Sequence, residues 1–306
     1  MRNNTASATT AIVDPRVGRF APSPTGPLHA GSLLAAVGSW LDARASGGRW
    51  TIRIDDLDPQ RCREHFVTLQ VETLAAFGLK PFGFEPTLWR QSTRQEAYAD
   101  ALARLSARVA VFTCDCTRRE RSQEAESGCL RDCRQRRPPS ADAALRADLT
   151  SLSACEVQDR SLGPIRFDPY QQRDVIVRRR DGAIAYALAV VVDDAAQGIT
   201  DVVRGGDLLE GTRWQLGLHQ ALGLHPPKYL HLPVLVEADG QKLAKSRHAI
   251  AIDPSEAPRL LRQTLRQLGQ SEPPDSRMTS ASILDWAAEH WRPEQFAGVA
   301  IIPTTV

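Results

Sequence analysis

Short apolar runs and helical spacing follow one another in the first part of the chain. The run at 17–20 predicts a strand, and Pro and Gly interrupt the seven residues after it. Apolar positions between 33 and 41 then share one helical face, and Gly-Gly at 47–48 ends the helix. Residues 50–54 predict a second strand. A strand, loop, helix and strand in this order favour a parallel sheet.

Later segments predict further helices and strands. The run from Ala185 to Val192 is continuously apolar, which is typical of a buried strand in a parallel sheet. The other predicted elements, in chain order, are a helix over 64–77 that stops at Gly78, a helix opened by a capping box of Thr93 and Glu96, a strand over 200–204, a helix over 214–222 closed by Gly223, a strand over 229–236 with a turn at Asp239-Gly240, and helices from Pro254 onward.

These elements predict an α/β protein whose parallel-sheet core is divided by an insertion. A polar, cysteine-containing segment separates the two groups of core elements. The expected regions are a polar N-terminal extension over 1–15, the first half of the core over 16–112, an insertion over 113–180, the second half of the core over 181–250, and a helical C-terminal region over 251–306.

Composition narrows the class of protein only a little. Of the 306 residues, 42% are hydrophobic and 24% charged, which is typical of a globular chain that buries a core. A net charge of +2 does not by itself indicate nucleic-acid binding. No apolar run is long enough to cross a membrane, and the N-terminus lacks the apolar block of a signal peptide. We expect a cytoplasmic protein that binds no membrane.

Four of the six cysteines gather in one short segment, at Cys114, Cys116, Cys129 and Cys133. In a reducing compartment such clustering favours a metal site over disulfides. Four thiolates suit tetrahedral zinc. The alternative is a group of metal-free or redox-active thiols.

The loop from Pro24 to Ser32 lies between a predicted strand and a predicted helix, where α/β sheets bind nucleotides. Helix N-terminal N–H groups there favour phosphate oxygens, and His29 and Thr25 can donate hydrogen bonds to them. Gly26 and Gly31 would permit close backbone approach. Neither a P-loop nor a dinucleotide-binding glycine pattern is present. A turn with a capping histidine is the alternative.

A second candidate segment is Gly240–Ser246, which carries Lys242 and Lys245 after a predicted strand and turn. Two lysines three residues apart can meet a triphosphate as point charges. Taken alone, the segment also fits a solvated basic loop.

Together the two segments are far more specific. His29-Ala-Gly-Ser32 and Lys242-Leu-Ala-Lys-Ser246 resemble the two signatures of class I aminoacyl-tRNA synthetases. Further blocks resemble the glutamyl branch of that class, and the resemblance extends over residues 16–250. These blocks are Gly18–Gly26, Arg53–Pro59, Val192–Asp194 and Val203–Gly205.

Within this branch the chain resembles the family of glutamyl-Q tRNA(Asp) synthetases, which lack the C-terminal anticodon-binding domain. Residues 251–306 are too few for such a domain. The resemblance implies a Rossmann-like class I core, a zinc-binding insertion and a short helical C-terminal part. It also implies tRNA-independent activation of L-glutamate with ATP and Mg²⁺, followed by transfer of glutamate to queuosine in the anticodon of tRNA(Asp). We expect the protein to be a monomer.

The resemblance also assigns roles to individual residues. It implies a glutamate pocket in which Arg204 holds the side-chain carboxylate, assisted by Arg19, and Asp55 holds the ammonium. His29, Lys245 and Thr25 would be catalytic. The implied glutamate-binding residues are Arg19, Ala21, Ser23, Asp55, Tyr186 and Arg204; the implied ATP-binding residues are Thr25, His29, Gly31, Lys242 and Lys245; and the implied ligands of one structural zinc are Cys114, Cys116, Cys129 and Cys133.

Two positions, Asp55 and Ala244, depart from the family pattern, whereas the spacing of the cysteines matches it. The family usually has Glu at the position of Asp55, so the ammonium contact here needs a water or a shifted loop. Ala244 replaces a common serine and removes one hydroxyl donor. Cys129 stands where the family can have tyrosine, which completes an all-sulfur set.

Arginines around the cysteines favour contact with RNA phosphates, although charge runs are often only solvated surface. Two other functions fit the same motifs: a truncated glutamyl-tRNA synthetase that charges a tRNA 3′ end, and a non-catalytic synthetase-derived tRNA-binding module. The arginines are Arg118, Arg119, Arg121, Arg134, Arg136, Arg137 and the run Arg178–Arg180.

Overall fold

The computed structural model describes residues 16–85, 87–117, 120, 133–136, 139, 143–236, 251–299 and 301–303. The helices are α1 (Ala30–Ala45), α2 (Glu64–Ala76), α3 (Gln95–Ser106), α5 (Cys133–Arg136), α6 (Tyr186–Ala196), α7 (Leu209–Leu222), α8 (Ala257–Gln267) and α9 (Ser280–Glu289). The strands are β1 (Val17–Phe20), β2 (Arg49–Ile54), β3 (Trp89–Arg90), β4 (Val111–Cys114), β5 (Ala144–Asp148), β6 (Cys155–Asp159), β7 (Gly163–Phe167), β8 (Asp174–Arg178), β9 (Asp201–Gly205), β10 (Lys228–Leu232), β11 (Val234–Val236) and β12 (Ile301–Pro303).

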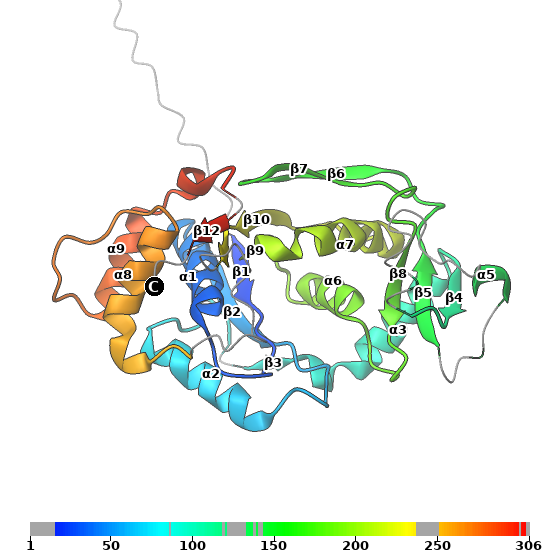
Figure 1. Ribbon diagram of the computed structural model, residues 1–306, viewed down its shortest axis with the longest axis horizontal. Helices are drawn as coiled ribbons and strands as arrows, with labels where there is room; N and C mark the ends of the chain where they lie inside the picture. The colour runs from blue at the N-terminus through cyan, green and yellow to red at the C-terminus, as the bar shows by residue number, and fades with distance from the viewer. Residues whose placement is uncertain are drawn as a thin grey trace, which may run out of the picture.

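Parallel strands from both halves of the chain form the centre of the molecule (Figure 1). One sheet has the order β1-β2-β3 and the other β7-β6-β10-β9, with parallel pairing of β1 to β2 and of β9 to β10. The sheets meet between β1 and β9, where the Thr200 N–H donates to the Val17 carbonyl at 3.0 Å. The Val17 N–H in turn donates to Thr200 Oγ1 at 2.9 Å. The predicted parallel-sheet core is confirmed.

Helices cover both faces of this core. On one face, α1, α8 and α9 pack their apolar residues against strand residues such as Ile52 and Leu232. On the other face, α3, α6 and α7 pack against Val202 and Tyr229. Figure 1 shows α8 and α9 at one end of the molecule and the sheet β4-β5-β8 with α5 at the other. The result is the three-layer α/β arrangement that parallel sheets require.

The segment 113–180 contributes strands to two different sheets. β5 pairs antiparallel with β4 and with β8, which makes a small sheet outside the core. β6, however, pairs in parallel with β10 through Tyr229 and Asp159. The segment that the sequence predicted as one insertion therefore also supplies a strand to the core sheet.

One predicted strand is wrong. The apolar run Ala185–Val192 belongs to α6, which spans Tyr186–Ala196. A short apolar run cannot be assigned to a strand or a buried helix from its periodicity alone. This helix is enclosed by α3, α7 and β8, so it is apolar on several faces and lacks the polar stripe of a surface helix.

Helix ends were predicted with mixed success. α7 ends at Gly223, whose φ of 67° is the left-handed conformation that glycine favours at this position. The capping box of Thr93 and Glu96 is wrong, because α3 begins at Gln95 after Arg94 and has no side-chain cap. Thr93 Oγ1 donates to the Arg90 carbonyl instead, at 2.9 Å. No helix in the described ranges is both long and apolar enough to span a bilayer.

Candidate active site

A cavity of about 430 Å³ opens at the carboxyl ends of β1, β9 and β10, beside the N-terminus of α1. Ligand sites in parallel α/β sheets occupy this position. The cavity brings together seven of the residues that the sequence assigned to glutamate or ATP, from segments far apart in the chain. They are Arg19, Ala21, Ser23, His29, Gly31, Tyr186 and Arg204.

Arg204 is a buried cation without a carboxylate partner among the residues that the structure describes. Its side chain is 5% exposed. Nη2 donates to Thr212 Oγ1 at 2.6 Å and to Gln215 Oε1 at 2.7 Å, and Nε donates to His231 Nε2 at 3.4 Å. Nη1 is buried and has no hydrogen-bond partner in the described ranges. Burying a charge without compensation is costly, so this guanidinium is suited to receive an anionic ligand.

Arg19, by contrast, already has a counter-ion. Its Nε and Nη2 donate to the two carboxylate oxygens of Asp194 at 3.1 and 3.3 Å. Asp194 also accepts from Arg53 Nη1 at 2.5 Å. These two guanidinium groups hold the pKa of Asp194 below its usual range, even though burial acts to raise it. Arg19 therefore lies in the cavity wall as one half of an ion pair.

Asp55 extends the same buried network. Its Oδ1 accepts from Arg53 Nε at 2.8 Å, whereas Oδ2 is buried without a hydrogen-bond partner in the described ranges. Burial raises the pKa of Asp55 to about 6, although Arg53 acts to lower it. Arg19, Arg53, Asp55 and Asp194 thus form one buried network of ion pairs, in which two arginines balance two aspartates. Arg204 lies outside this network, and Asp207 also lines the first cavity.

His29 caps the N-terminus of α1. Its Nδ1 accepts from the Ser32 N–H at 3.3 Å, so the proton of the neutral ring is on Nε2. A Cβ atom at Gly31 would lie 3.2 Å from His29 Cε1, and glycine there leaves room for the imidazole. Gly26 has no such role, because a Cβ atom there would meet nothing within 4 Å. Its carbonyl instead accepts from Gln70 at 2.7 Å.

Lys242, Ala244 and Lys245 lie outside the described residues, and so does the turn at Asp239-Gly240. Val234 and Leu235 of β11, which precede this segment, line the cavity. Ala251, which follows it, forms a bridge with His29 at the N-terminus of α1. Described residues on both sides of the lysines therefore lie near the α1 N-terminus.

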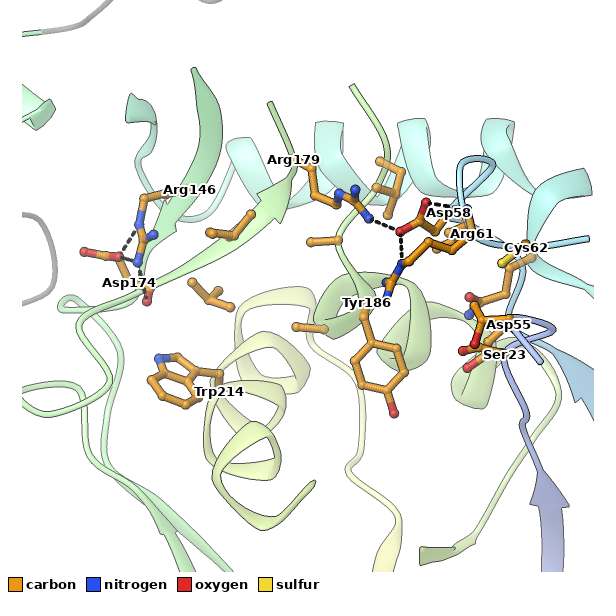
Figure 2. A pocket seen from close by; sticks show the side chains of 18 residues that line it. Ser23, Asp55, Asp58, Arg61, Cys62, Arg146, Asp174, Arg179, Tyr186 and Trp214 are labelled. Atoms are coloured by element: carbon orange, nitrogen blue, oxygen red, sulfur yellow. Dashed lines mark hydrogen bonds and ion pairs between the residues drawn. The ribbon is translucent and has the colours of Figure 1, made fainter. Parts of the chain in front are cut away.

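A second cavity of about 440 Å³ adjoins the first (Figure 2). Ser23 and Tyr186 line both cavities, and Tyr186 is 42% exposed at the start of α6. Thr25 and Asp55 line the second cavity, whereas His29 lines the first.

Charged side chains surround the second cavity and are mostly paired with one another. Figure 2 shows Arg179 and Arg61 both reaching Asp58, at 3.2 and 2.8 Å. Arg146 pairs with Asp174 on the side of Trp214. Hydrogen bonds from Arg61 and Arg179 lower the pKa of Asp58 to about 2. The wall of this cavity therefore combines paired charged groups with apolar residues such as Val175 and Ile184, and the Trp214 indole lies at the end away from Ser23.

Three of the four predicted metal ligands come together. Cys114, Cys116 and Cys133 are buried, and their sulfur atoms all lie within 4.8 Å of one another. Cys116 Sγ and Cys133 Sγ are 3.7 Å apart. Two thiolates of a tetrahedral zinc site, with Zn–S bonds of about 2.3 Å, are separated by about 3.8 Å. The cluster can hold a metal ion; Cys129 lies outside the described residues.

The arginines near this cluster have partners within the chain. Arg134 pairs with Asp148 at 2.5 Å, and Arg136 pairs with Asp115. Arg180 donates to the Cys116 carbonyl at 2.9 Å. The remaining predicted arginines of the cysteine segment, Arg118, Arg119, Arg121 and Arg137, lie outside the described residues.

Sequence reasoning did not assign a role to several residues that shape the site. Arg53 and Asp194 form the central ion pair, and Thr212, Gln215 and His231 orient Arg204. The sequence did contain a pattern that could have identified Arg53 and Asp194. Each is a charged residue beside or within an apolar run, and buried charges need partners.

The fold and the cavity define a class I aminoacyl-tRNA synthetase catalytic domain, a ligase-type enzyme. A family model described as tRNA synthetases class I (E and Q), catalytic domain, matches residues 16–273. The structure is similar to that of a glutamate tRNA ligase from Elizabethkingia meningosepticum, with a TM-score of 0.75. That match covers 95% of this chain and 67% of the ligase at 21% identity, and it shows the shared fold.

Curated relatives narrow the class to one family. Glutamyl-Q tRNA(Asp) synthetase from Xanthomonas campestris is 48% identical over 94% of this chain and 95% of its own length. The protein of the same name from Pseudomonas aeruginosa is 42% identical over 94% of this chain and 97% of its own length. The chain belongs to the glutamyl-Q tRNA(Asp) synthetase family, as the sequence resemblance predicted.

Proposed function

We propose that the protein activates L-glutamate with ATP without tRNA, and then transfers it to queuosine in the anticodon of tRNA(Asp). The observation that carries the first step is Arg204, a buried guanidinium with no carboxylate partner in the described ranges. Glutamate has two carboxylates and one ammonium at neutral pH. Its side-chain carboxylate would complement the charge of the Arg204 guanidinium.

Arg204 would bind the side-chain carboxylate, because a guanidinium pairs with a carboxylate through parallel hydrogen bonds. Ala21 and Ser23, in the loop after β1, would contact the amino acid backbone. Tyr186 stands between the two cavities and can donate its hydroxyl. Asp55 lies on the far side of Ser23, where its unpartnered Oδ2 would meet the substrate ammonium directly or through a water.

ATP would bind at the N-terminus of α1, where backbone N–H groups favour phosphate oxygens. The glutamate α-carboxylate attacks the α-phosphorus, a new O–P bond forms, and the bond to the pyrophosphate oxygen breaks. His29, through its Nε2–H, and Lys245 stabilise the charge that develops on the phosphates. Lys242 and the Mg²⁺ bound to ATP assist the departure of pyrophosphate. The chain contributes positioning and charge.

The second cavity would admit the acceptor. It shares Ser23 and Tyr186 with the first cavity, so an acceptor hydroxyl there would stand beside the glutamyl-adenylate carbonyl. Attack of that hydroxyl forms an ester, releases its proton and breaks the bond to AMP. We place the protein in the cytoplasm, because ATP and tRNA are its proposed substrates, and we propose that it acts as a monomer.

We propose that the buried cysteines bind one zinc ion with Cys129 as the fourth ligand. The sulfur separation fits a tetrahedral thiolate site. A closed site of this kind would brace β4 and α5 and take no part in the chemistry, because it lies outside both cavities.

The acceptor distinguishes this function from its alternatives. Labelled glutamate and ATP are incubated with tRNA(Asp) that contains queuosine, with tRNA(Asp) that lacks it, and with tRNA(Glu). The proposal predicts labelling of the first RNA alone, and the label should survive removal of the 3′ terminal adenosine. Labelling of tRNA(Glu) would instead support a synthetase that charges a 3′ end.

A further inference from the structure

Arg204 is oriented by a chain of buried groups that reaches β6. His231, on β10, is fully buried, and its Nε2 lies 3.4 Å from Arg204 Nε and 3.0 Å from Thr212 Oγ1. On the other side of the ring, His231 Nδ1 lies 2.7 Å from Asp159 Oδ2. Asp159 is itself 1% exposed, at the end of β6.

Asp159 is held as an anion that can only accept. Its Oδ1 accepts from the backbone N–H groups of Ser161 and Leu162, both at 2.8 Å. Its Oδ2 accepts from the His231 backbone N–H at 3.0 Å. Burial acts to raise the pKa of Asp159, but these donors and the His231 ring lower it overall. The proton between Asp159 and His231 therefore belongs to Nδ1 of the histidine.

This assignment fixes the other ring nitrogen. Burial lowers the pKa of His231, so the imidazole is neutral, with Nδ1 protonated and Nε2 carrying a lone pair. Nε2 can then accept from Arg204. The opposite tautomer would direct an N–H at the Arg204 N–H, and a charged imidazolium would repel the guanidinium.

Among the described residues, the side chains that hydrogen-bond to Arg204 are uncharged. Thr212 and Gln215 accept from Nη2, and the Tyr229 ring lies 5.4 Å from the guanidinium carbon. Tyr229 also stacks on His231, with ring centres 5.8 Å apart. These neighbours saturate one edge of the guanidinium with neutral acceptors, and Nη1 remains for a ligand.

We propose that Asp159 and His231 are positioning residues that hold Arg204 ready for the glutamate side chain. Asp159 sets the tautomer, His231 presents a neutral acceptor, and the positive charge of Arg204 stays available to the substrate. The inference rests on the proposed function, since it takes glutamate as the ligand of Arg204. Strand β6, which the segment after the cysteines supplies, would thus take part in amino-acid recognition through His231 and Arg204.

Two substitutions of His231 separate this role from a purely structural one. In His231→Gln the side-chain oxygen can occupy the place of Nε2 and accept from Arg204. In His231→Asn the amide can still donate to Asp159 but cannot reach Arg204. Both variants are tested in glutamate-dependent pyrophosphate exchange, with KM for glutamate and KM for ATP measured separately and folding monitored by thermal denaturation.

Loss of one hydrogen bond to a charged group corresponds to about a tenfold change in affinity. His231→Asn should raise KM for glutamate about tenfold and leave KM for ATP unchanged, whereas His231→Gln should change KM for glutamate less than about threefold. Equal effects of the two variants on KM for glutamate, whether large or absent, overturn the inference, as does a parallel rise in KM for ATP. Wild-type protein without any glutamate-dependent exchange overturns the proposed function itself, and the inference with it.

Discussion

Arg19 and Asp194 form an ion pair 3.1 Å long in the wall of the first cavity. The pair joins the first half of the core to the second, across 175 residues of sequence. Asp194 also pairs with Arg53, but Arg53 has Asp55 as a second partner, so the two arginines and two aspartates balance one another inside the protein. We therefore propose that Arg204 is the cation that determines which amino acid the site accepts.

Replacement of Arg204 tests this assignment. Arg204→Gln removes the charge and the forked donors, so KM for glutamate in pyrophosphate exchange should rise about a hundredfold or more, which corresponds to about 2.7 kcal/mol. Arg204→Lys keeps the charge without the fork and should recover only part of the loss. KM for ATP should be unchanged in both. A normal KM for glutamate in Arg204→Gln would show that another group binds the side-chain carboxylate.

Asp55 predicts a pH dependence of glutamate binding. Its pKa is about 6 because burial disfavours the carboxylate, so the group becomes protonated as the pH falls through 6 and can no longer pair with an ammonium. KM for glutamate should rise about tenfold between pH 7 and pH 5. Asp55→Asn should have a high KM that does not vary over this range. A pH-dependent KM in Asp55→Asn that matches the wild type would contradict the assignment.

The sequence predicted the elements whose apolar spacing is regular, such as α1 and α7, together with a nucleotide site in the loop before α1. It could not predict the ion pairs that organise the site. Asp194 lies two residues after the apolar run that local pattern favoured as a strand, and its placement on α6 is what turns it toward Arg19 and Arg53. Such partners are set by tertiary packing.

The same limit applies to the neighbours of Arg204. The residue itself was identified through a motif. His231 and Asp159 lie 72 positions apart, on strands that become neighbours only when β6 joins β10. Asp159 fell within the segment predicted as an insertion, so nothing local connected it with the amino-acid pocket.

Arg53 should be required for folding. It is fully buried between Asp55 and Asp194, and Arg53→Met would leave two carboxylates without the cation between them. Breaking a buried ion pair costs about 3–5 kcal/mol, which urea denaturation would measure. Arg166→Met is the control, because Arg166 pairs with Glu156 on the surface and should matter little. Similar stabilities of the two variants would contradict the structural role of Arg53.

The cysteine cluster should bind zinc, and the loss of one of its thiolates should remove most of the metal. Metal analysis of the purified protein should find about one zinc per chain, as one tetrahedral thiolate site requires. Cys133→Ser should lose most of it and unfold at a lower temperature. Cys155→Ser, on β6 outside the cluster, should keep its zinc. Full zinc content in Cys133→Ser would mean that the zinc is bound elsewhere in the protein.

The most direct test of the central claim is exchange of labelled pyrophosphate into ATP with no tRNA present. We predict exchange with glutamate but not with glutamine or aspartate. Glutamine has no side-chain carboxylate to pair with Arg204, and the side-chain carboxylate of aspartate is one methylene too short to reach it. Lys245→Ala and His29→Ala should each reduce the rate about a hundredfold or more, because each removes a donor to the developing phosphate charge. Wild-type protein that exchanges only when tRNA is added, or Lys245→Ala with full activity, would contradict this account.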